Sequence, residues 1–339
     1  MTNGLSGPRK QFLDVLRVLA TCAVVLMHVL TGATDVTDAS IMPEYRSLLL
    51  SVMDLVTWCV PIFLLISGYL FLNPERTLTY PVMIKKYCRR IALAILLFGV
   101  PYAASELVVA ERTFRIRMIP EALKMTLTGH TWSHMWYLYL ILFLYLITPL
   151  LKKVLRVLPV WGVAAVMAVI FLGSSVAPFL NKVLDVNSIP VLPDGGVYFL
   201  YYLCGYFFAV REVCVDKGRN VWLTAAVAVL ALGMILSRTL AGFSIQMAYN
   251  YPFTVLLAVL LFAAGWNGSI KKHRIPWQEA GALSFAVYLV HPVYVNLLYK
   301  FVKITPFTVL EQCGVQSVAA GQAVLILPVS YTHLRAHET

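Results

Sequence analysis

The 339-residue chain has little charge: Asp, Glu, Lys and Arg make up 13% of it, whereas hydrophobic residues make up 60% and the mean hydropathy is +0.78. No soluble domain of this length needs so much apolar surface, so the composition excludes an ordinary water-soluble protein. Acidic residues are scarcer than basic ones, with 16 Asp and Glu against 27 Lys and Arg. The basic residues form no aromatic-interleaved patch, so we expect no nucleic-acid partner.

The six cysteines form no CxxC pair and have no metal-ligand spacing. We therefore expect neither a metal site nor a disulfide framework, and interpret the cysteines as small apolar residues. The chain also lacks a long polar linker, a low-complexity tract and a repeat of 20 to 50 residues, so no second soluble domain is expected.

What the sequence has instead is long apolar segments, most of which reach the roughly 20 residues that a membrane-spanning helix requires. They predict an all-α, polytopic integral membrane helical bundle of about ten transmembrane helices, forming a single domain over residues 1–330. The first is too long for a signal-peptide core, and we expect it to be retained. The ten segments lie near 12–31, 48–72, 91–109, 136–151, 157–180, 197–210, 220–240, 248–266, 279–299 and 315–330.

The Lys and Arg residues between these segments predict the orientation in the cell (plasma or inner) membrane. With the N-terminus in the cytoplasm, the inner segments hold 16 of them and the outer segments nine, as the positive-inside rule requires. Loop 110–135 is the exception among the outer segments, and we expect part of it to be an amphipathic segment lying on membrane lipid.

The last residues, 331–339, read YTHLRAHET and break the apolar pattern abruptly. We expect this tail to be non-native sequence and give His333 and His337 no functional role.

Ionisable residues inside the first segment are the most informative feature of the chain, because such residues are costly in a membrane and usually functional. Arg17 and His28 are eleven positions apart, which places them on one helix face and roughly 16 Å apart along the axis. Asp14 precedes Arg17 by three residues and shares that face.

Six sequence blocks occur in an order that resembles the membrane acyltransferase 3 family, and together they cover nearly the whole chain. The first is FLDVLRVLATCAVVLMHV, with its Arg, ten residues and His. The others are VPIFLLISGYLF at 60–71, KKYCRR at 85–90, HMWYLYLILFLYLITPLL at 134–151, YFLYYLCGYFFA at 198–209 and SFAVYLVHPV at 284–293.

The resemblance implies a ten-helix membrane enzyme that moves an acyl group, commonly acetyl, from cytoplasmic acyl-CoA to a hydroxyl of a glycan or lipid-linked sugar. Acetyl-CoA is the expected acyl donor, and a carbohydrate or lipid-linked glycan precursor the expected acceptor. One motif departs from the family, because Lys86-Tyr87-Cys88-Arg89 stands where some members have Arg-x-x-Arg.

The first segment supplies the candidate catalytic residues His28, Arg17 and Asp14. Acyl transfer to an alcohol needs a base for the hydroxyl proton, and an imidazole near neutral pH suits that task. Arg17 suits a CoA phosphate, which its planar fork can bind bidentately. The structural alternatives are a histidine bonded to a neighbouring helix and an arginine that reaches the inner headgroups, with Asp14 as its counter-charge.

The remaining candidates lie in two groups. Lys85, Lys86, Arg89 and Arg90 suit the other CoA phosphates, although a topology signal attracted to anionic lipid explains them nearly as well. The aromatic and histidine candidates for acceptor binding are His134, Trp136, Tyr137, Tyr288 and His291. Interfacial anchoring is the commoner role for the first three, and stacking on a sugar is the alternative. Pro292 frees a backbone carbonyl, so His291 could simply support a helix kink.

Two further positions receive structural interpretations. We assign Ser67 and Gly68 to close helix packing, since no base lies near them in sequence. Asp54 is an intramembrane carboxyl whose partner the sequence does not identify.

These features favour a membrane O-acetyltransferase. A secondary transporter or flippase of a lipid-linked sugar is the alternative, although the chain lacks the two related halves with interrupted helices that such proteins often show. A non-catalytic membrane sensor would leave the spacing of Arg17 and His28 unexplained. The sequence specifies neither the acceptor, nor the acyl length, nor the oligomeric state.

Overall fold

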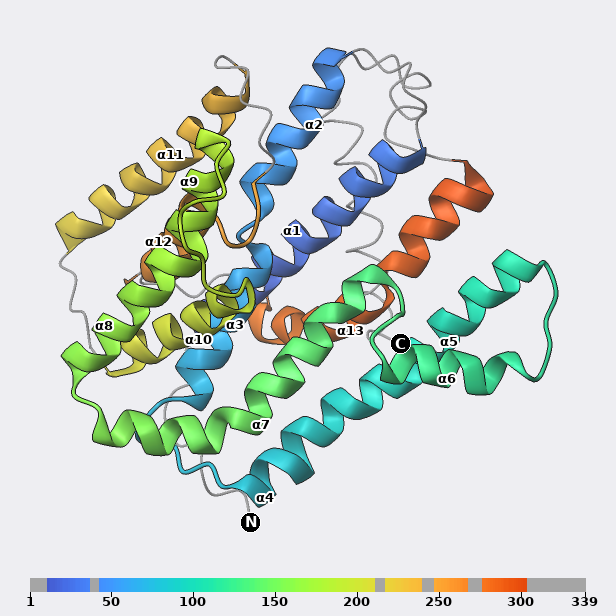
Figure 1. The fold of residues 1–339 in the computed structure, drawn as a ribbon, viewed down its shortest axis with the longest axis horizontal. Helices are drawn as coiled ribbons and strands as arrows, with labels where there is room; N and C mark the ends of the chain where they lie inside the picture. Colours follow the sequence, from blue (N-terminus) through green and yellow to red (C-terminus); the bar gives the residue numbers. More distant parts are fainter. Residues whose placement is uncertain (1–10, 37–42, 211–216, 240–246, 268–275, 304–339) are drawn as a thin grey trace. The chain divides into compact units, whose positions relative to one another are not determined.

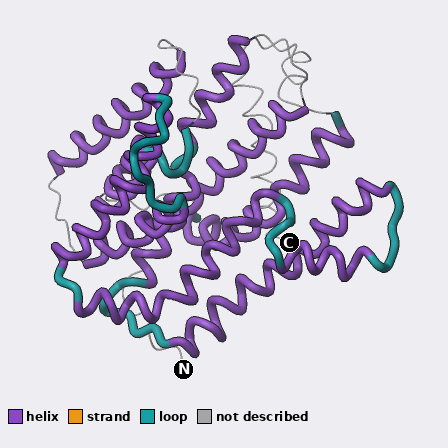
Figure 2. The backbone as a smooth tube through the Cα atoms, viewed as in Figure 1, coloured by secondary structure: helices purple, strands orange, loops and turns teal. Residues whose placement is uncertain are grey.

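The structure, a computed structural model, describes residues 11–36, 43–210, 217–239, 247–267 and 276–303, and within these ranges it contains helices and loops but no strand (Figures 1 and 2). The predicted all-α class is confirmed. The chain divides into two compact units, which we describe separately: unit 1 comprises Met1–Tyr69 and Val166–Thr339, and unit 2 comprises Leu70–Ala165.

Unit 1 holds the first and the last of the described helices, and several of its helices pack against α1. Its elements are α1 (Gln11–Val36), α2 (Pro43–Val56), α3 (Cys59–Phe71), η3 (Leu172–Val176), α9 (Ala177–Leu184), α10 (Gly195–Val210), α11 (Lys217–Thr239), α12 (Pro252–Asn267), α13 (Trp277–Asn296) and η4 (Leu297–Val302). Helices α2, α12 and α13 all contact α1.

Unit 2 is built from the middle of the chain. Its elements are α4 (Tyr80–Val82), η1 (Met83–Cys88), α5 (Arg89–Glu111), α6 (Met118–Leu127), η2 (Ser133–Met135) and α7 (Trp136–Val157). Helix α8 (Val160–Phe171) starts in unit 2 and ends in unit 1.

Apolar helices long enough to cross a membrane recur along the described chain, as a multi-pass membrane protein requires. Six helical stretches qualify: Gln11–Gly32, Leu49–Phe71, Tyr80–Glu111, Ser133–Val157, Val160–Leu184 and Trp277–Val302. Three shorter apolar helices, Gly195–Val210, Trp222–Met234 and Pro252–Trp266, fall on the predicted sixth, seventh and eighth segments. The predicted tenth segment, 315–330, lies outside the described residues, so the expected total of about ten spans stays a prediction.

The second predicted span coincides with the apolar stretch Leu49–Phe71 but is interrupted, because the chain turns at Thr57 and Trp58 between α2 and α3. Pro61 explains the break, since it has no N–H and its ring conflicts with the carbonyl of Thr57 four residues earlier. Asp54, one turn before the break, is buried, and its Oδ1 accepts a hydrogen bond of 2.8 Å from the backbone N–H of Met247. One partner that the sequence left open is therefore a loop backbone.

Two glycines allow α3 and α10 to cross at very close range. A Cβ added at Gly68 would overlap the backbone carbonyl of Tyr202, and one added at Gly205 would overlap the backbone at Leu65 and Tyr69. The predicted packing role of Gly68 is confirmed, since small residues let helix backbones approach where larger side chains would keep them apart.

Helices α1 and α13 lie side by side and run in the same direction. Near their starts Gly281 lies against Asp14, and near their ends the Tyr299 hydroxyl donates a 2.7 Å hydrogen bond to the Val29 carbonyl. Gly32 leaves room for the same Tyr299 ring. Residues about 270 positions apart are thereby fixed against one another along the length of α1.

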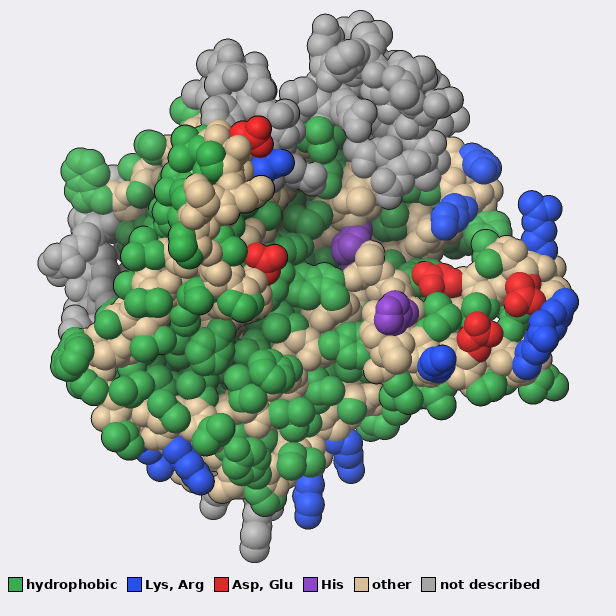
Figure 3. All heavy atoms as spheres, in the orientation of Figure 1, with side chains coloured by type: hydrophobic (Ala, Val, Ile, Leu, Met, Phe, Trp, Pro, Cys, Tyr) green, Lys and Arg blue, Asp and Glu red, His purple; other side chains and the backbone are tan. Residues whose placement is uncertain are grey.

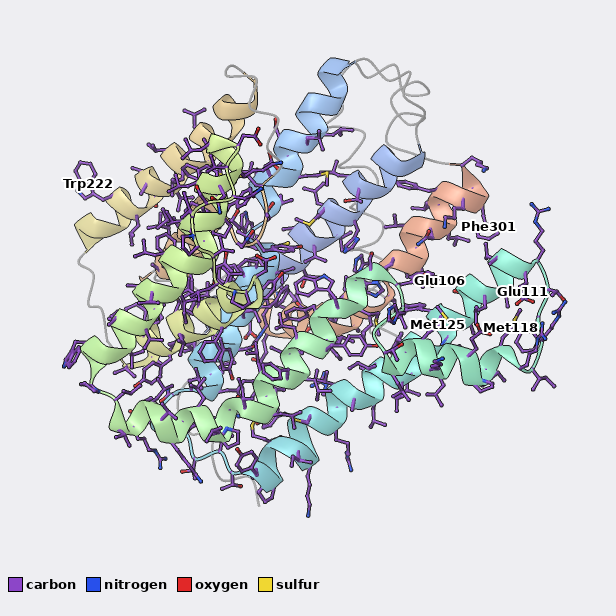
Figure 4. The ribbon with its side chains drawn as sticks, viewed as in Figure 1. Glu106, Glu111, Met118, Met125, Trp222 and Phe301 are labelled. Atoms are coloured by element: carbon purple, nitrogen blue, oxygen red, sulfur yellow. The ribbon has the colours of Figure 1, made fainter. Side chains whose placement is uncertain are left out.

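Helices α5 and α6 form a hairpin in unit 2, with Gly99 against the Thr126 side chain. Met118 and Met125 of α6 lie between the two helices, near Glu106 and Glu111 of α5 (Figure 4). The opposite face of α6 exposes Ile119, Leu123 and Leu127. This two-faced helix occupies the stretch predicted to be amphipathic; its contact with lipid stays a prediction.

Exposed aromatic side chains occur elsewhere on the apolar helices. Trp222 points away from α11 in Figure 4 and is 75% exposed, and Phe301 of η4 is 76% exposed. Exposure of such large rings is expected where a surface faces lipid or its headgroup region.

Candidate active site

Asp14 and Arg17 form an ion pair one turn into α1. The Arg17 Nη1 atom donates to Asp14 Oδ1 at 2.8 Å, and the two side chains are 24% and 2% exposed. A guanidinium carries five N–H donors, and the described structure gives Arg17 only this one side-chain partner. The buried carboxylate therefore orients Arg17, and the remaining donors can bind an anionic group.

His28 lies about three turns further along α1 and is half-buried. Its ring contacts the ring of His291 on α13, with centroids 4.9 Å apart and planes at 53°. His291 is completely buried, and its ring centroid is 6.1 Å from that of Tyr288 on the same helix. Three predicted site residues from opposite ends of the sequence thus meet at one place in unit 1.

The four basic residues predicted to bind CoA phosphates lie together at the start of α5 in unit 2. Lys85 and Lys86 are on η1, Arg89 and Arg90 on the first turn of α5, and all four are exposed. Lys and Arg side chains gather around this region and the end of α7 (Figure 3). The arrangement presents a dense positive charge to a phosphate or to an anionic headgroup.

Two cations that sequence reasoning counted only as topology signals belong to the same part of unit 2. Arg76 donates to the Tyr87 hydroxyl at 2.5 Å and to the Leu70 carbonyl at 3.2 Å, and its guanidinium lies over the Phe71 ring. Lys152, near the end of α7, is buried and donates to the Asn73 carbonyl. Arg76 and Arg156 are its charged neighbours, and no carboxylate in the described chain pairs with Lys152.

A buried ammonium with cationic neighbours and no acidic partner favours occupation by an anion, since an uncompensated charge is costly away from water. The sequence contains only a weak indication that Lys152 differs from the other basic residues. Lys152 and Lys153 are adjacent, and only the fold distinguishes the buried side chain from the exposed one.

The aromatic candidates of the fourth span occupy different settings in unit 2. His134 is buried beside Tyr102 and Trp132, whose rings stack at 4.3 Å, and its ring centroid is 5.6 Å from that of Tyr102. Trp136 and Tyr137 are half-buried neighbours. His134 is thus part of an aromatic cluster, and the partly exposed Trp136 and Tyr137 are the more accessible of the three.

The structure therefore arranges the predicted site residues in two sets, one in each unit. Unit 1 joins His28 to Tyr288 and His291, with the Asp14 and Arg17 pair on the same helix. Unit 2 carries the exposed basic group and the candidates of the fourth span. The first set offers a base and an anion-binding group on one helix. The second set offers a cationic surface.

Comparison with known proteins gives one match. A family model described as an acyltransferase domain matches residues 10–332, which is most of the chain and includes every predicted site residue. No curated protein and no solved structure matches the chain.

Proposed function

This multi-pass membrane chain belongs to the acyltransferase family, and on that premise we propose that it is an O-acetyltransferase acting on a cell-surface carbohydrate or its lipid-linked precursor. Acetyl-CoA from the cytoplasm is the proposed donor. The acceptor hydroxyl approaches from the other side of the membrane. The acetyl group and the carbohydrate acceptor are both part of the proposal, and both are inferred from the family resemblance.

The observation that carries the proposal is the distribution of groups on α1. Near its start an ion-paired Arg17 keeps donors for an anion, and roughly 16 Å along the axis His28 meets a second histidine. A CoA thioester is elongated, with phosphates at one end and the reactive carbonyl at the other. One helix therefore offers a group suited to each end.

In the proposed reaction, His28 accepts the proton of the acceptor hydroxyl as the hydroxyl oxygen attacks the thioester carbonyl. The C–S bond then breaks, an ester forms, and the departing CoA sulfur takes the proton from His28. No net change in oxidation state occurs. Transfer through a covalent acyl-histidine is the two-step version of the same chemistry.

The donor's phosphates are assigned to Arg17 and to the group Lys85, Lys86, Arg89 and Arg90. Charge supports the assignment: the four are exposed, and Arg17 retains donors. Arginine binds phosphate through a planar fork, whereas lysine acts as a point charge. We also place the N-terminus in the cytoplasm, because this orientation puts the basic loops on the side where acyl-CoA is made.

A transporter or flippase of a lipid-linked sugar is the second candidate, and the interruption between α2 and α3 favours it, since transporters bind substrates at broken helices. Asp54, the carboxylate beside that break, holds the backbone N–H of Met247. This hydrogen bond is a contact within the protein, so Asp54 has a structural role beside the break.

Mass spectrometry of envelope glycans from cells with and without the gene distinguishes the candidates. The acetyltransferase proposal predicts that one glycan loses ester-linked acetyl groups and otherwise keeps its structure. A transporter of the lipid-linked precursor predicts a change in the amount of the whole glycan, and no selective loss of its acetyl esters. An unchanged acetyl-ester pattern in every envelope polymer would contradict the enzymatic proposal.

A further inference from the structure

The sequence pair His291-Pro292 has a specific consequence inside α13. Pro292 has no N–H, so the carbonyl of Tyr288, four residues earlier, loses its helical hydrogen-bond donor. The ring of His291 takes its place: the Nδ1 atom lies 2.8 Å from the Tyr288 carbonyl and 3.2 Å from the Val287 carbonyl. The proline thus creates an acceptor, and the histidine beside it supplies the donor.

These two contacts determine which nitrogen of His291 carries the proton. A carbonyl oxygen only accepts, so Nδ1 must be protonated to bond with either one. A neutral imidazole has one ring proton, which leaves the lone pair on Nε2. The Nε2 atom lies on the edge of the ring away from these carbonyls and is buried.

His28 is the imidazole next to this ring. The two centroids are 4.9 Å apart and the planes are inclined by 53°, so the rings are in contact without being stacked face to face. Two neutral imidazoles are compatible neighbours when one presents a lone pair and the other an N–H.

We propose that His291 is a positioning residue for His28: its Nε2 accepts the N–H of His28 and fixes the tautomer in which the other His28 nitrogen holds a lone pair. This inference rests on the proposed function, in which that lone pair accepts the acceptor's proton. After the transfer both His28 nitrogens carry protons, and His291 continues to accept one of them. The proton then passes from His28 to the departing CoA sulfur.

Two substitutions separate this role from a purely structural one, because Asn and Gln imitate different ring nitrogens of histidine. In His291→Asn the side-chain NH₂ can keep the bond to the Tyr288 carbonyl, but nothing occupies the Nε2 position. In His291→Gln the longer amide brings its oxygen to the Nε2 position, where it can accept from His28. A structural role through Nδ1 is preserved by Asn, whereas a positioning role through Nε2 is preserved by Gln.

For the acetyl-transfer reaction, we expect His291→Asn to lower kcat by about 10–100-fold, as losing the partner that orients a histidine does at metal sites, with little change in the KM for acetyl-CoA. His291→Gln should restore at least part of that loss. Equal kcat values for the wild type and a folded His291→Asn protein would overturn the proposal. A His291→Asn protein more active than His291→Gln would do the same.

A second readout does not depend on activity. In protein labelled with ¹⁵N-histidine, the ring-nitrogen chemical shifts distinguish a protonated nitrogen from one with a lone pair. The His28 signals are identified as those that are absent from the spectrum of His28→Gln. We expect one His28 tautomer in the wild type and a mixture in His291→Asn. An unchanged His28 tautomer in His291→Asn would overturn the positioning role. Absence of transfer by wild-type protein would count against the proposed function alone.

Discussion

Gly281 of α13 lies directly against Asp14 of α1: a Cβ added to this glycine would be 3.0 Å from both the Cβ and the Oδ1 of Asp14. The two helices therefore approach each other closely where the carboxylate holds Arg17. Because Asp14 is buried by this approach, the orientation of Arg17 depends on the residue at position 281. A glycine with no chemistry of its own thus contributes to the candidate donor site.

Replacing Gly281 with leucine should displace α13 from Asp14, disturb the ion pair and weaken acetyl-CoA binding, measured by calorimetry on purified protein. Gly281→Ala should have a smaller effect, because a shift of a few tenths of an ångström accommodates one methyl group. The exposed neighbour Ala282 provides the control, since Ala282→Leu adds similar bulk without touching α1. Equal affinities of Gly281→Leu and Ala282→Leu would contradict this dependence.

The crossing of α3 and α10 should tolerate no side chain at Gly68 or Gly205. We expect Gly68→Ala and Gly205→Ala to destabilise the protein by several kcal/mol or to prevent folding, because the added methyl overlaps backbone that cannot move independently. Thermal unfolding in detergent measures the effect. Gly233→Ala is the matched control, since nothing lies within 4 Å of its Cβ position and alanine favours a helix. Equal melting temperatures for the three variants would refute the close crossing.

Arg17→Ala should weaken acetyl-CoA binding while the protein stays folded, because the guanidinium donors not used by Asp14 are assigned to a phosphate. Arg17→Lys should recover part of the affinity, since an ammonium keeps the charge and loses the planar fork. Binding of acetyl-CoA, with desulfo-CoA as a probe of the phosphate contribution, gives the comparison. Wild-type affinity in Arg17→Ala would remove Arg17 from the donor site.

Lys152 and Lys153 should differ although they are adjacent. If the anion favoured beside Lys152, Arg76 and Arg156 is a phosphate of the donor, Lys152→Gln should reduce acetyl-CoA affinity by about tenfold or more, the effect of losing one charged hydrogen bond. Lys153→Gln removes an exposed cation and should have little effect. Similar affinities of the two variants would assign Lys152 to structure. If added anionic lipid restores the acetyl-CoA affinity of Lys152→Gln, the anion that Lys152 binds is a lipid headgroup.

Much of the helical architecture could be predicted from the sequence, because a span requires only a local run of apolar residues. The first nine predicted segments all fall on described helices. The break between α2 and α3 was missed: Pro61 is visible in the sequence, but hydropathy does not register a backbone interruption. The partner of Asp54 could not be predicted either, since Met247 is 193 residues away and contributes only a backbone N–H.

The candidate site was predictable where it depends on spacing within one helix. Asp14 and Arg17 are three residues apart, and their ion pair follows from helix geometry. The contact between His28 and His291 was not predictable in this way, because it requires α1 and α13 to pack in parallel. The close approach that permits this packing depends on Gly281 and Gly32, whose importance appears only once their neighbours are known.

The most direct test of the account is acetyl transfer by a folded His28→Gln protein, measured as ester-linked acetate on envelope glycans in cells that lack the native gene. If His28 accepts the acceptor's proton, this variant should lose transfer by about 10²–10⁴-fold, because glutamine cannot take up a proton. It should still be expressed at the wild-type level and bind acetyl-CoA. Near-normal turnover by His28→Gln would contradict the assignment of His28 as the catalytic base.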